Sequence, residues 1–242
     1  MDRLTRHELK QDEFREVVDQ LDEYLKTHLR EILTVVGLVV VVVGATAGLR
    51  YYIGAQEASA NLELAVALRT FEAYVGNLSP EATAAESQSF STANAKYQKA
   101  LEQFNAIELK YRMFPRPKAA SIARYEAGIC ESLVGNPAAA INTLQQASRD
   151  GDKEIAALAQ FALAGELFKT GKKDEAIKIY QNLADHPTLS VPKTMAQLGL
   201  ADAVKDSEPK RARQLYQQIA QESGSSPSIA EAMKQQIDDL HQ

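Results

Sequence analysis

The stretch ILTVVGLVVVVVGATAGL, Ile32 to Leu49, decides how the rest of the chain is organised. Its eighteen residues include no charged side chain. As a helix they would cover about 27 Å, and Tyr51, Tyr52 and Ile53 extend the apolar length to roughly the thickness of a bilayer core. The sequence therefore predicts one transmembrane helix over residues 32–53, between an N-terminal tail and a long C-terminal region.

A cleavable secretory signal is the competing interpretation, because Ala45-Thr46-Ala47 has the small-x-small form of a cleavage site. The region before the apolar run is rich in Asp and Glu and about thirty residues long, whereas a signal peptide begins with a short basic region. The run is also longer than the apolar part of most signals. We therefore expect the anchor to be retained.

The tail, residues 1–31, is predicted to be an amphipathic helix that continues into the membrane segment. Its seam residues recur at alternating steps of four and three, and they are Phe14, Val18, Leu21, Leu25, His28 and Ile32. The seam covers about two and a half heptads, fewer than a coiled coil needs. We interpret it as a juxtamembrane helix, with a partner-binding coil as the alternative, and His28 as a seam residue because no partner stands at metal-ligand spacing.

Basic residues favour a cytoplasmic tail. Those close to the apolar run on its N-terminal side are Arg15, Lys26 and Arg30, whereas the other side has Arg50 and then Arg69. Arg50, Tyr51 and Tyr52 fit the far membrane interface, where aromatic rings and a guanidinium sit between hydrocarbon and water. We expect a single-pass protein whose C-terminal region is extracytoplasmic.

Gly37, Gly44 and Gly48 lie seven and four residues apart, so they share one face of the membrane helix. The step from Gly44 to Gly48 is a small-xxx-small spacing, which lets a second membrane helix approach closely. Gly and Ala are also common in membrane helices generally. A packing face and plain composition are both consistent with this pattern.

Overall composition limits the remaining classes. The net charge is −5 and no dense basic patch occurs, which argues against nucleic acid as a partner. Cys130 is the single cysteine, so no intramolecular disulfide can form, and its helical context predicts a small core residue. The chain has no Trp and much Ala, which favours close-packed helices over a sheet.

Between the anchor and the repeats, residues 54–117, we expect two membrane-proximal helices and a loop. Apolar periodicity predicts a helix from Gln56 to about Val75 that Gly76-Asn77 ends. Residues 81–92 lack periodicity and are predicted to form a loop or a loosely held helix. A second helix is predicted from about Ser91 to Met113, before prolines that break the pattern.

Self-similarity with a step of 36 residues is the strongest pattern after the apolar stretch. Related segments begin at Thr143, Ile179 and Leu215, and each follows a small residue at the same step: Ala140, Ala176 and Ala212. Gly135 and Gly171 share the step. Helix, Gly-containing turn and helix at this period are typical of an α-solenoid. We predict an all-α fold with such pairs over residues 118–242, closed by a capping helix that contains Ile229, Met233 and Ile237.

Residues 153–187 resemble a tetratricopeptide repeat. The positions that match, within one residue, are Phe161, Leu163, Ala164, Leu167, Gly171, Ala176, Tyr180 and Pro187. Ala164 and Ala176 allow two helices to approach, and Tyr180 fills the gap between one pair and the next. The neighbouring copies are degenerate, with Glu131 where a bulky side chain is expected and Asp206-Ser207 in place of the turn glycine.

We find no catalytic motif. The chain has no G-x-S-x-G, Walker-type Gly-Lys loop, H-E-x-x-H or C-x-x-C, and its four histidines are scattered: His7, His28, His186 and His241. Asp150-Gly151-Asp152 could suggest a cation site, but it lacks the spacing and closing Glu of an EF-hand, so turn and helix-cap roles are expected. We expect neither an enzyme nor a cofactor or metal.

Recognition of protein partners is the function that is left. In tetratricopeptide folds the first helix of each pair lines the concave side, so the resemblance implies the groove residues Tyr125, Ile129, Phe161, Phe168 and Lys169. Core packing is the alternative role for Tyr125 and Phe161. For Lys169 the alternative is a solvated residue that complements the helix dipole.

In layout the chain resembles the bacterial family of ancillary Sec-translocon subunits, because it combines a short tail, one anchor, the Arg50-Tyr51-Tyr52 exit and an Ala-rich repeat region. Motif detail covers only about residues 119–187. The resemblance implies a type II inner-membrane protein whose periplasmic repeats work near the translocon with a membrane-anchored chaperone of the peptidyl-prolyl isomerase type. Translocon subunits, that chaperone and exported clients are the expected partners.

Two other functions stay open. A periplasmic scaffold for envelope assembly or cell division would resemble the repeat proteins of outer-membrane biogenesis and the Tol-Pal system, although those are usually lipid-anchored or unanchored and this chain has no lipobox Cys. A regulatory membrane protein, degraded or sequestered through its cytoplasmic tail, is the second.

Overall fold

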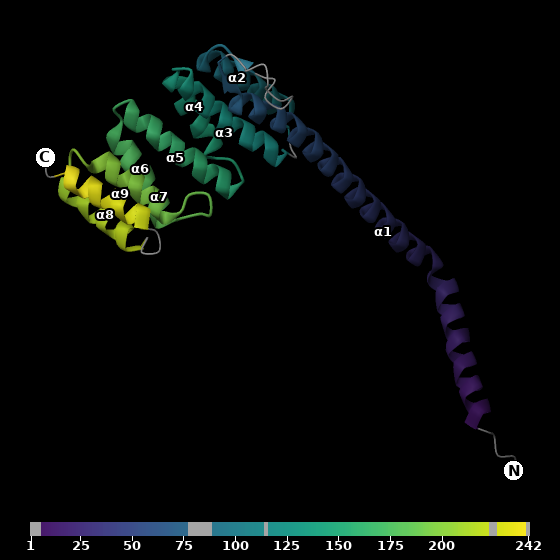
Figure 1. The fold of residues 1–242 in the computed structure, drawn as a ribbon. Coiled ribbons are helices and arrows are strands. Elements are labelled where there is room, and N and C mark those ends of the chain that lie inside the picture. Colours follow the sequence, from purple (N-terminus) through teal and green to yellow (C-terminus); the bar gives the residue numbers. More distant parts are fainter. Residues whose placement is uncertain (1–5, 77–88, 114–115, 223–226, 241–242) are drawn as a thin grey trace. The chain divides into compact units, whose positions relative to one another are not determined.

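The computed structural model describes residues 6–76, 89–113, 116–222 and 227–240, and over these ranges the protein is mostly helical (Figure 1). The predicted helical class is confirmed in this coarse sense. The chain divides into two compact units, Met1–Ala55 and Gln56–Gln242.

Helix α1 (Arg6–Glu72) contains the apolar stretch, and it is long and apolar enough to cross a membrane. The described side chains from Leu33 to Leu49 are exposed, because no other described element covers them. Thr34 and Thr46 donate their hydroxyls to backbone carbonyls one turn earlier, to Glu31 O at 2.7 Å and Val42 O at 2.9 Å, so neither hydroxyl needs water. The side chains of the predicted tail seam from Phe14 to Leu25 lie outside the described part of the structure.

The helix predicted from Gln56 to about Val75 is not a separate element: it is the last part of α1, and it ends slightly before the expected position. The helix stops at Glu72, and Tyr74–Val75 form strand β1, which pairs in parallel with strand β2 (Ser89–Phe90). Gly76, at φ +130°, then donates its N–H to Phe90 O at 2.9 Å. This long-range pairing satisfies backbone groups that a further helical turn would have used. Most of the predicted 81–92 loop lies outside the described residues.

The first core of the Gln56–Gln242 unit is formed by the end of α1, α2 (Ala93–Lys110) and α3 (Lys118–Leu133). Thr92 caps α2 by accepting a hydrogen bond from Ala95 N, so the helix begins slightly later than the periodicity predicts. Small side chains let the helices approach, and the fully buried ones include Ala60, Ala67, Ala100, Ala123 and Ala127. Cys130 is buried among them as a free thiol.

Within the described residues after α3, six further helices follow, each packed chiefly against its neighbours in sequence (Figure 1). They are α4 (Pro137–Ala147), α5 (Lys153–Lys169), α6 (Lys173–Asp185), α7 (Lys193–Val204), α8 (Pro209–Glu222) and α9 (Pro227–Asp239). Gly135 and Gly171 occupy the α3–α4 and α5–α6 turns at φ +84° and +85°, where a side chain would be strained. The α7–α8 turn instead uses Ser207, whose N–H donates to Val204 O.

Side chains at the 36-residue step fill the space between helices. Leu144, Tyr180 and Tyr216 are all buried. Tyr180 lies against Gly199 of α7, and Leu144 lies against Gly128 of α3. The Tyr216 hydroxyl donates to Asp202 Oδ1 at 2.7 Å. The repeated pattern thus corresponds to repeated packing positions in the structure.

Candidate functional site

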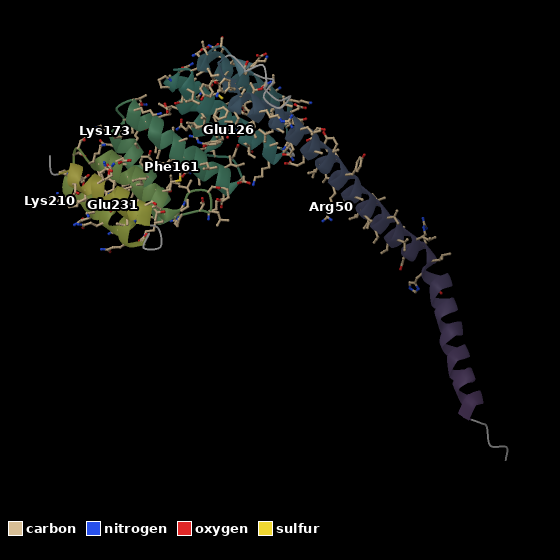
Figure 2. All side chains as sticks on the ribbon, viewed as in Figure 1. Arg50, Glu126, Phe161, Lys173, Lys210 and Glu231 are labelled. Atoms are coloured by element: carbon tan, nitrogen blue, oxygen red, sulfur yellow. The ribbon has the colours of Figure 1, made fainter. Side chains whose placement is uncertain are left out.

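A cavity of about 230 Å³ opens between α3, α4, α5 and α6, and we call it the α3–α6 pocket. Its lining residues are Ile129, Ser132, Leu133, Leu144, Phe161, Ala162, Gly165, Glu166, Lys169 and Tyr180. Figure 2 labels Phe161, which belongs to α5 near the middle of the helical domain. Three of the lining residues come from α3 and five from α5, so these two helices build most of the pocket.

One part of the α3–α6 pocket is apolar. The rings of Phe161 and Tyr180 meet edge to face with centroids 5.3 Å apart, an arrangement that holds both side chains in place. Leu144 is fully buried behind them, and Ile129 is partly buried. Gly165 leaves room in front of Tyr180, because a Cβ there would lie 3.6 Å from the tyrosine hydroxyl.

The other part carries a buried acid. The Glu166 side chain is only 8% exposed, and its Oε1 accepts hydrogen bonds from Ser132 Oγ and Lys169 Nζ, both at 2.7 Å. Among the described residues, no hydrogen bond involves Glu166 Oε2 or the Tyr180 hydroxyl. Burial, with the Asp202 carboxylate adding to it, raises the pKa of Tyr180 to about 12, so its hydroxyl keeps its proton. The pocket therefore offers two polar groups with unused hydrogen-bonding capacity.

Three of the five predicted groove residues lie at the α3–α6 pocket, and the other two lie elsewhere. Ile129, Phe161 and Lys169 line the α3–α6 pocket, whereas Tyr125 and Phe168 do not. Tyr125 is partly buried against the core, and burial raises its pKa. The Phe168 ring lies 5.3 Å from Lys173 Nζ, which covers it.

Sequence reasoning missed Ser132 and Glu166. One signal could have found the acid: Asp202 stands 36 residues after Glu166, at the step of the repeat. Tyr180 was identified only as a residue that fills a gap, yet it also borders the pocket.

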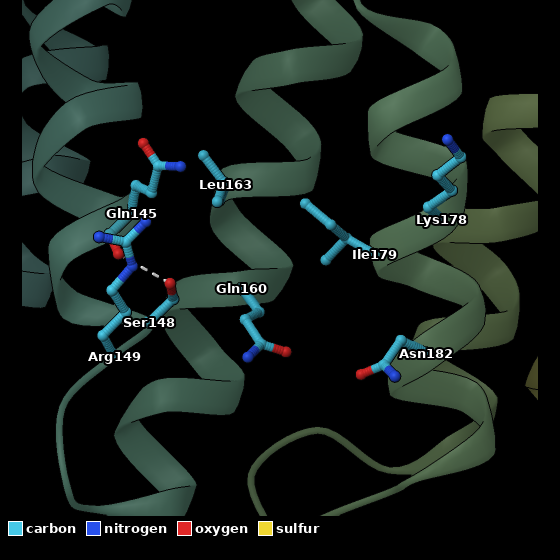
Figure 3. Close-up of a pocket in the computed structure, with 8 residues that line it drawn as sticks. All are labelled: Gln145, Ser148, Arg149, Gln160, Leu163, Lys178, Ile179 and Asn182. Carbon is cyan, nitrogen blue, oxygen red and sulfur yellow. Dashed lines mark hydrogen bonds between the residues drawn. The ribbon is translucent and has the colours of Figure 1, made fainter.

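A second cavity, of about 320 Å³, lies between α4, α5 and α6 (Figure 3). Gln145, Ser148 and Arg149 come from α4 and its end, Gln160 and Leu163 from α5, and Lys178, Ile179 and Asn182 from α6. Figure 3 shows Arg149 and Lys178 on opposite sides of this cavity. The two cations of its lining do not converge on one point, and Leu163 and Ile179 add apolar surface between the polar side chains.

The Asp150-Gly151-Asp152 turn has cap and ion-pair roles. Asp152 caps α5 by accepting from Glu154 N and Ile155 N, and it pairs with Lys118 Nζ at 2.9 Å. Asp150 Oδ1 lies 2.8 Å from Arg124 Nη1. Within the described ranges, no group of three or more His, Cys, Asp or Glu side chains is placed to hold a metal ion.

The candidate membrane residues are all on the surface of α1. A Cβ at Gly37, Gly44 or Gly48 would meet no heavy atom within 4 Å, so this face is open to another helix. Arg50 is exposed, as are Tyr51 and Tyr52. Helix packing and interfacial anchoring by these residues stay predictions.

Comparisons with known proteins add no identity. The chain matches no protein-family model, and neither a curated protein nor a solved structure is found to be similar to it.

Proposed function

We propose that this protein is a membrane-anchored scaffold that binds segments of other proteins in the α3–α6 pocket. The observation that carries this proposal is the pocket itself, which joins an apolar wall to unused polar groups. That combination suits recognition of a peptide side chain together with a polar group next to it.

The repeat architecture supports the proposal. We take α3/α4, α5/α6 and α7/α8 as three tetratricopeptide-like pairs of an α-solenoid, with α9 as the cap. Glycine turns in the first two pairs and the buried residues Leu144, Tyr180 and Tyr216 are in keeping with such an array. The pocket lies mainly on α3 and α5, the first helices of their pairs, which is the side that tetratricopeptide folds use for binding.

The anchor adds a physical advantage. A binding domain tethered by α1 shares one surface with partners in the same membrane, and this raises their effective concentration without any new contact. We propose the inner membrane of a bacterium, with residues 1–31 in the cytoplasm and the Gln56–Gln242 unit in the periplasm. The basic residues before the apolar stretch support this orientation.

Translocon subunits, a membrane-anchored periplasmic chaperone and exported proteins are the partners we propose. The layout of tail, anchor and helical repeats supports them through its resemblance to ancillary Sec-translocon subunits. Scaffolding of envelope assembly or division is the alternative, and regulation through the cytoplasmic tail is the second.

Site-specific crosslinking in native membranes tests this function. A photoreactive amino acid is placed at Leu133 or Lys169, at the rim of the α3–α6 pocket, and at Lys210 on α8 as the control. We expect the first two positions to crosslink translocon subunits or their chaperone, and Lys210 to give much less product. Recovery of only envelope or division proteins would reject the translocon role. Crosslinks from Lys210 alone would reject the pocket as the binding site.

A further inference from the structure

Resting on the proposed function, we infer that the α3–α6 pocket selects peptide segments in which a large apolar side chain neighbours a lysine or arginine. The occupant is a segment of a partner protein, and the charge at the pocket wall identifies its chemistry.

The size and walls of the pocket set the apolar half of this specificity. A cavity of about 230 Å³ bounded by Ile129, Leu144 and the paired rings of Phe161 and Tyr180 suits one aromatic or long aliphatic side chain. Burial of such a side chain is favourable because it removes apolar surface from water. A peptide with alanine in its place would leave most of the cavity unfilled.

Glu166 sets the charged half. A carboxylate accepts hydrogen bonds at both oxygens, and only Oε1 has described partners. Its side chain is nearly buried, so a cation that reaches Oε2 interacts with it through less water than at an exposed site. The Tyr180 hydroxyl also lines the pocket, and its oxygen can accept a hydrogen bond from a polar group of the peptide.

Lys169 does not cancel this preference. Its side chain is 67% exposed, and its contact with Glu166 is a pair three residues apart on one helix. The Glu166 end of the pair is 8% exposed, whereas the Lys169 end lies mostly in solvent, so the Lys169 ammonium can return to water when another cation reaches the carboxylate. A partner's cation can share the carboxylate with Lys169 or replace it. A peptide acid in the same place would be repelled by the buried carboxylate.

Peptide binding to the full chain tests the inference. The protein is held in nanodiscs of zwitterionic phosphatidylcholine, and the probes are fluorescent Gly-Ser peptides with Phe-Lys, Phe-Glu or Ala-Lys at the centre. We expect Phe-Lys to bind about tenfold more tightly than either of the others. Phe-Glu lacks the charge-assisted hydrogen bond and Ala-Lys lacks the buried apolar side chain, and the loss of either contact is enough for about a tenfold difference. Empty nanodiscs are the blank, and equal signal from them would assign binding to lipid and overturn the inference.

Three variants locate the effect. Glu166→Gln keeps the shape and an acceptor for Ser132, and it should abolish the preference for Phe-Lys over Phe-Glu. Glu175→Gln removes the same charge from an exposed position of α6 and should keep the preference. Gly165→Met fills the pocket in front of Tyr180 and should weaken both Phe peptides. Protection of the buried Cys130 thiol from labelling shows that each variant is folded.

The outcomes separate this inference from the proposed function. Equal binding of Phe-Lys and Phe-Glu to the unmodified protein overturns the charge preference, as does a preference that survives Glu166→Gln. If no peptide binds while Lys169 still crosslinks partners in membranes, the inferred specificity is wrong and the scaffold function stands. If Lys169 gives no crosslinks to partners in membranes, the proposed scaffold function is itself wrong.

Discussion

The helical glycines of this domain differ in how close the neighbouring side chains lie, so the same substitution has different effects on stability. A Cβ at Gly128 would lie 2.7 Å from Leu144 Cγ, and one at Gly199 would lie 2.6 Å from Tyr180 Cε1. At Gly165 the nearest atom, the Tyr180 hydroxyl, is 3.6 Å away. The first two glycines permit close approach of buried side chains, whereas the third leaves a cavity open.

We therefore expect alanine to act in opposite directions at these sites. Gly165→Ala should stabilise the domain by about 0.5–1 kcal/mol, because alanine loses less backbone entropy in a helix. Gly128→Ala and Gly199→Ala should destabilise it by about 1–3 kcal/mol, because a buried side chain must move. The readout is thiol labelling of Cys130 in increasing denaturant. This thiol is 0% exposed, and burial together with Glu126 and Glu131 raises its pKa to about 12, so it reacts only after opening.

Gly151→Ala is the matched control, because its Cβ would meet open space in a turn. Similar losses for Gly165→Ala and Gly128→Ala would contradict this account of helix packing.

Glu126 makes stability depend on pH. Burial, and then the Glu72 carboxylate, raises its pKa from 4.5 to about 7. The folded state therefore binds more protons than the unfolded state between these values, and stability falls as pH rises from about 4.5 to 7. Glu126→Gln should remove this slope and stabilise the protein at pH 8 by roughly 1–3 kcal/mol. Denaturant unfolding followed by circular dichroism at pH 5 and pH 8 measures both effects. An unchanged slope in Glu126→Gln, with Glu175→Gln as the control, would contradict the assignment.

At the scale of elements, one arginine joins three segments. Arg124 of α3 lies 2.8 Å from Glu108 of α2 and 2.8 Å from Asp150 in the α4–α5 turn. The Asp150 side chain is 11% exposed and that of Arg124 is 15% exposed, so water screens the pair weakly. The network links the first core to the start of α5. Farther along, the same helix supplies five of the ten residues that line the α3–α6 pocket.

Arg124→Met should destabilise the domain by about 2–4 kcal/mol, because it leaves two partly buried carboxylates without their partner. Lys99→Met breaks an exposed pair with Glu102 on α2 and should cost less than about 0.5 kcal/mol. Cys130 labelling in increasing denaturant measures the free energy of unfolding of both variants. Equal effects would show that the Arg124 network contributes no more than a surface ion pair.

At the scale of the whole molecule, the main expectation concerns α1. If it spans a membrane, the chain stays in the membrane pellet during alkaline carbonate extraction. Replacing Val39 and Val42 by arginine should release it, because each arginine costs about 2.5–3.5 kcal/mol near the centre of a bilayer. The same two positions changed to leucine are the control and should behave like the unmodified chain. Retention of the arginine variant in the pellet would contradict a spanning helix.

Orientation has a separate readout in the same cells. Protease added outside bacterial spheroplasts should remove the Gln56–Gln242 unit and leave the tail protected. Full protection of that unit would reverse the proposed topology.

Local patterns predicted much of the fold because they act within a few residues. The apolar stretch, the 36-residue step and the turn glycines Gly135 and Gly171 each follow from short-range geometry. The end of α1 at Glu72 could not be predicted, since it depends on strand pairing with Ser89–Phe90, far along the chain. The same limit applies to the site. Periodicity placed Tyr125 and Phe168 on the same helices as Ile129 and Phe161, but a pocket depends on which neighbouring helix covers each side chain.

The sequence by itself therefore determined the helical class, the apolar segment, the spacing of the repeats and the burial of Cys130. Each depends on hydrophobic periodicity or local backbone preference. Only the tertiary structure decided that Glu166 lies nearly buried in the same pocket as Phe161 and Tyr180, with one oxygen held by Ser132 and Lys169. The reason is physical: α3 brings Ser132 to Glu166, and α6 brings Tyr180 to the same pocket, from far along the chain. Packing alone decides whether a charge between helices meets water, a partner or an open pocket.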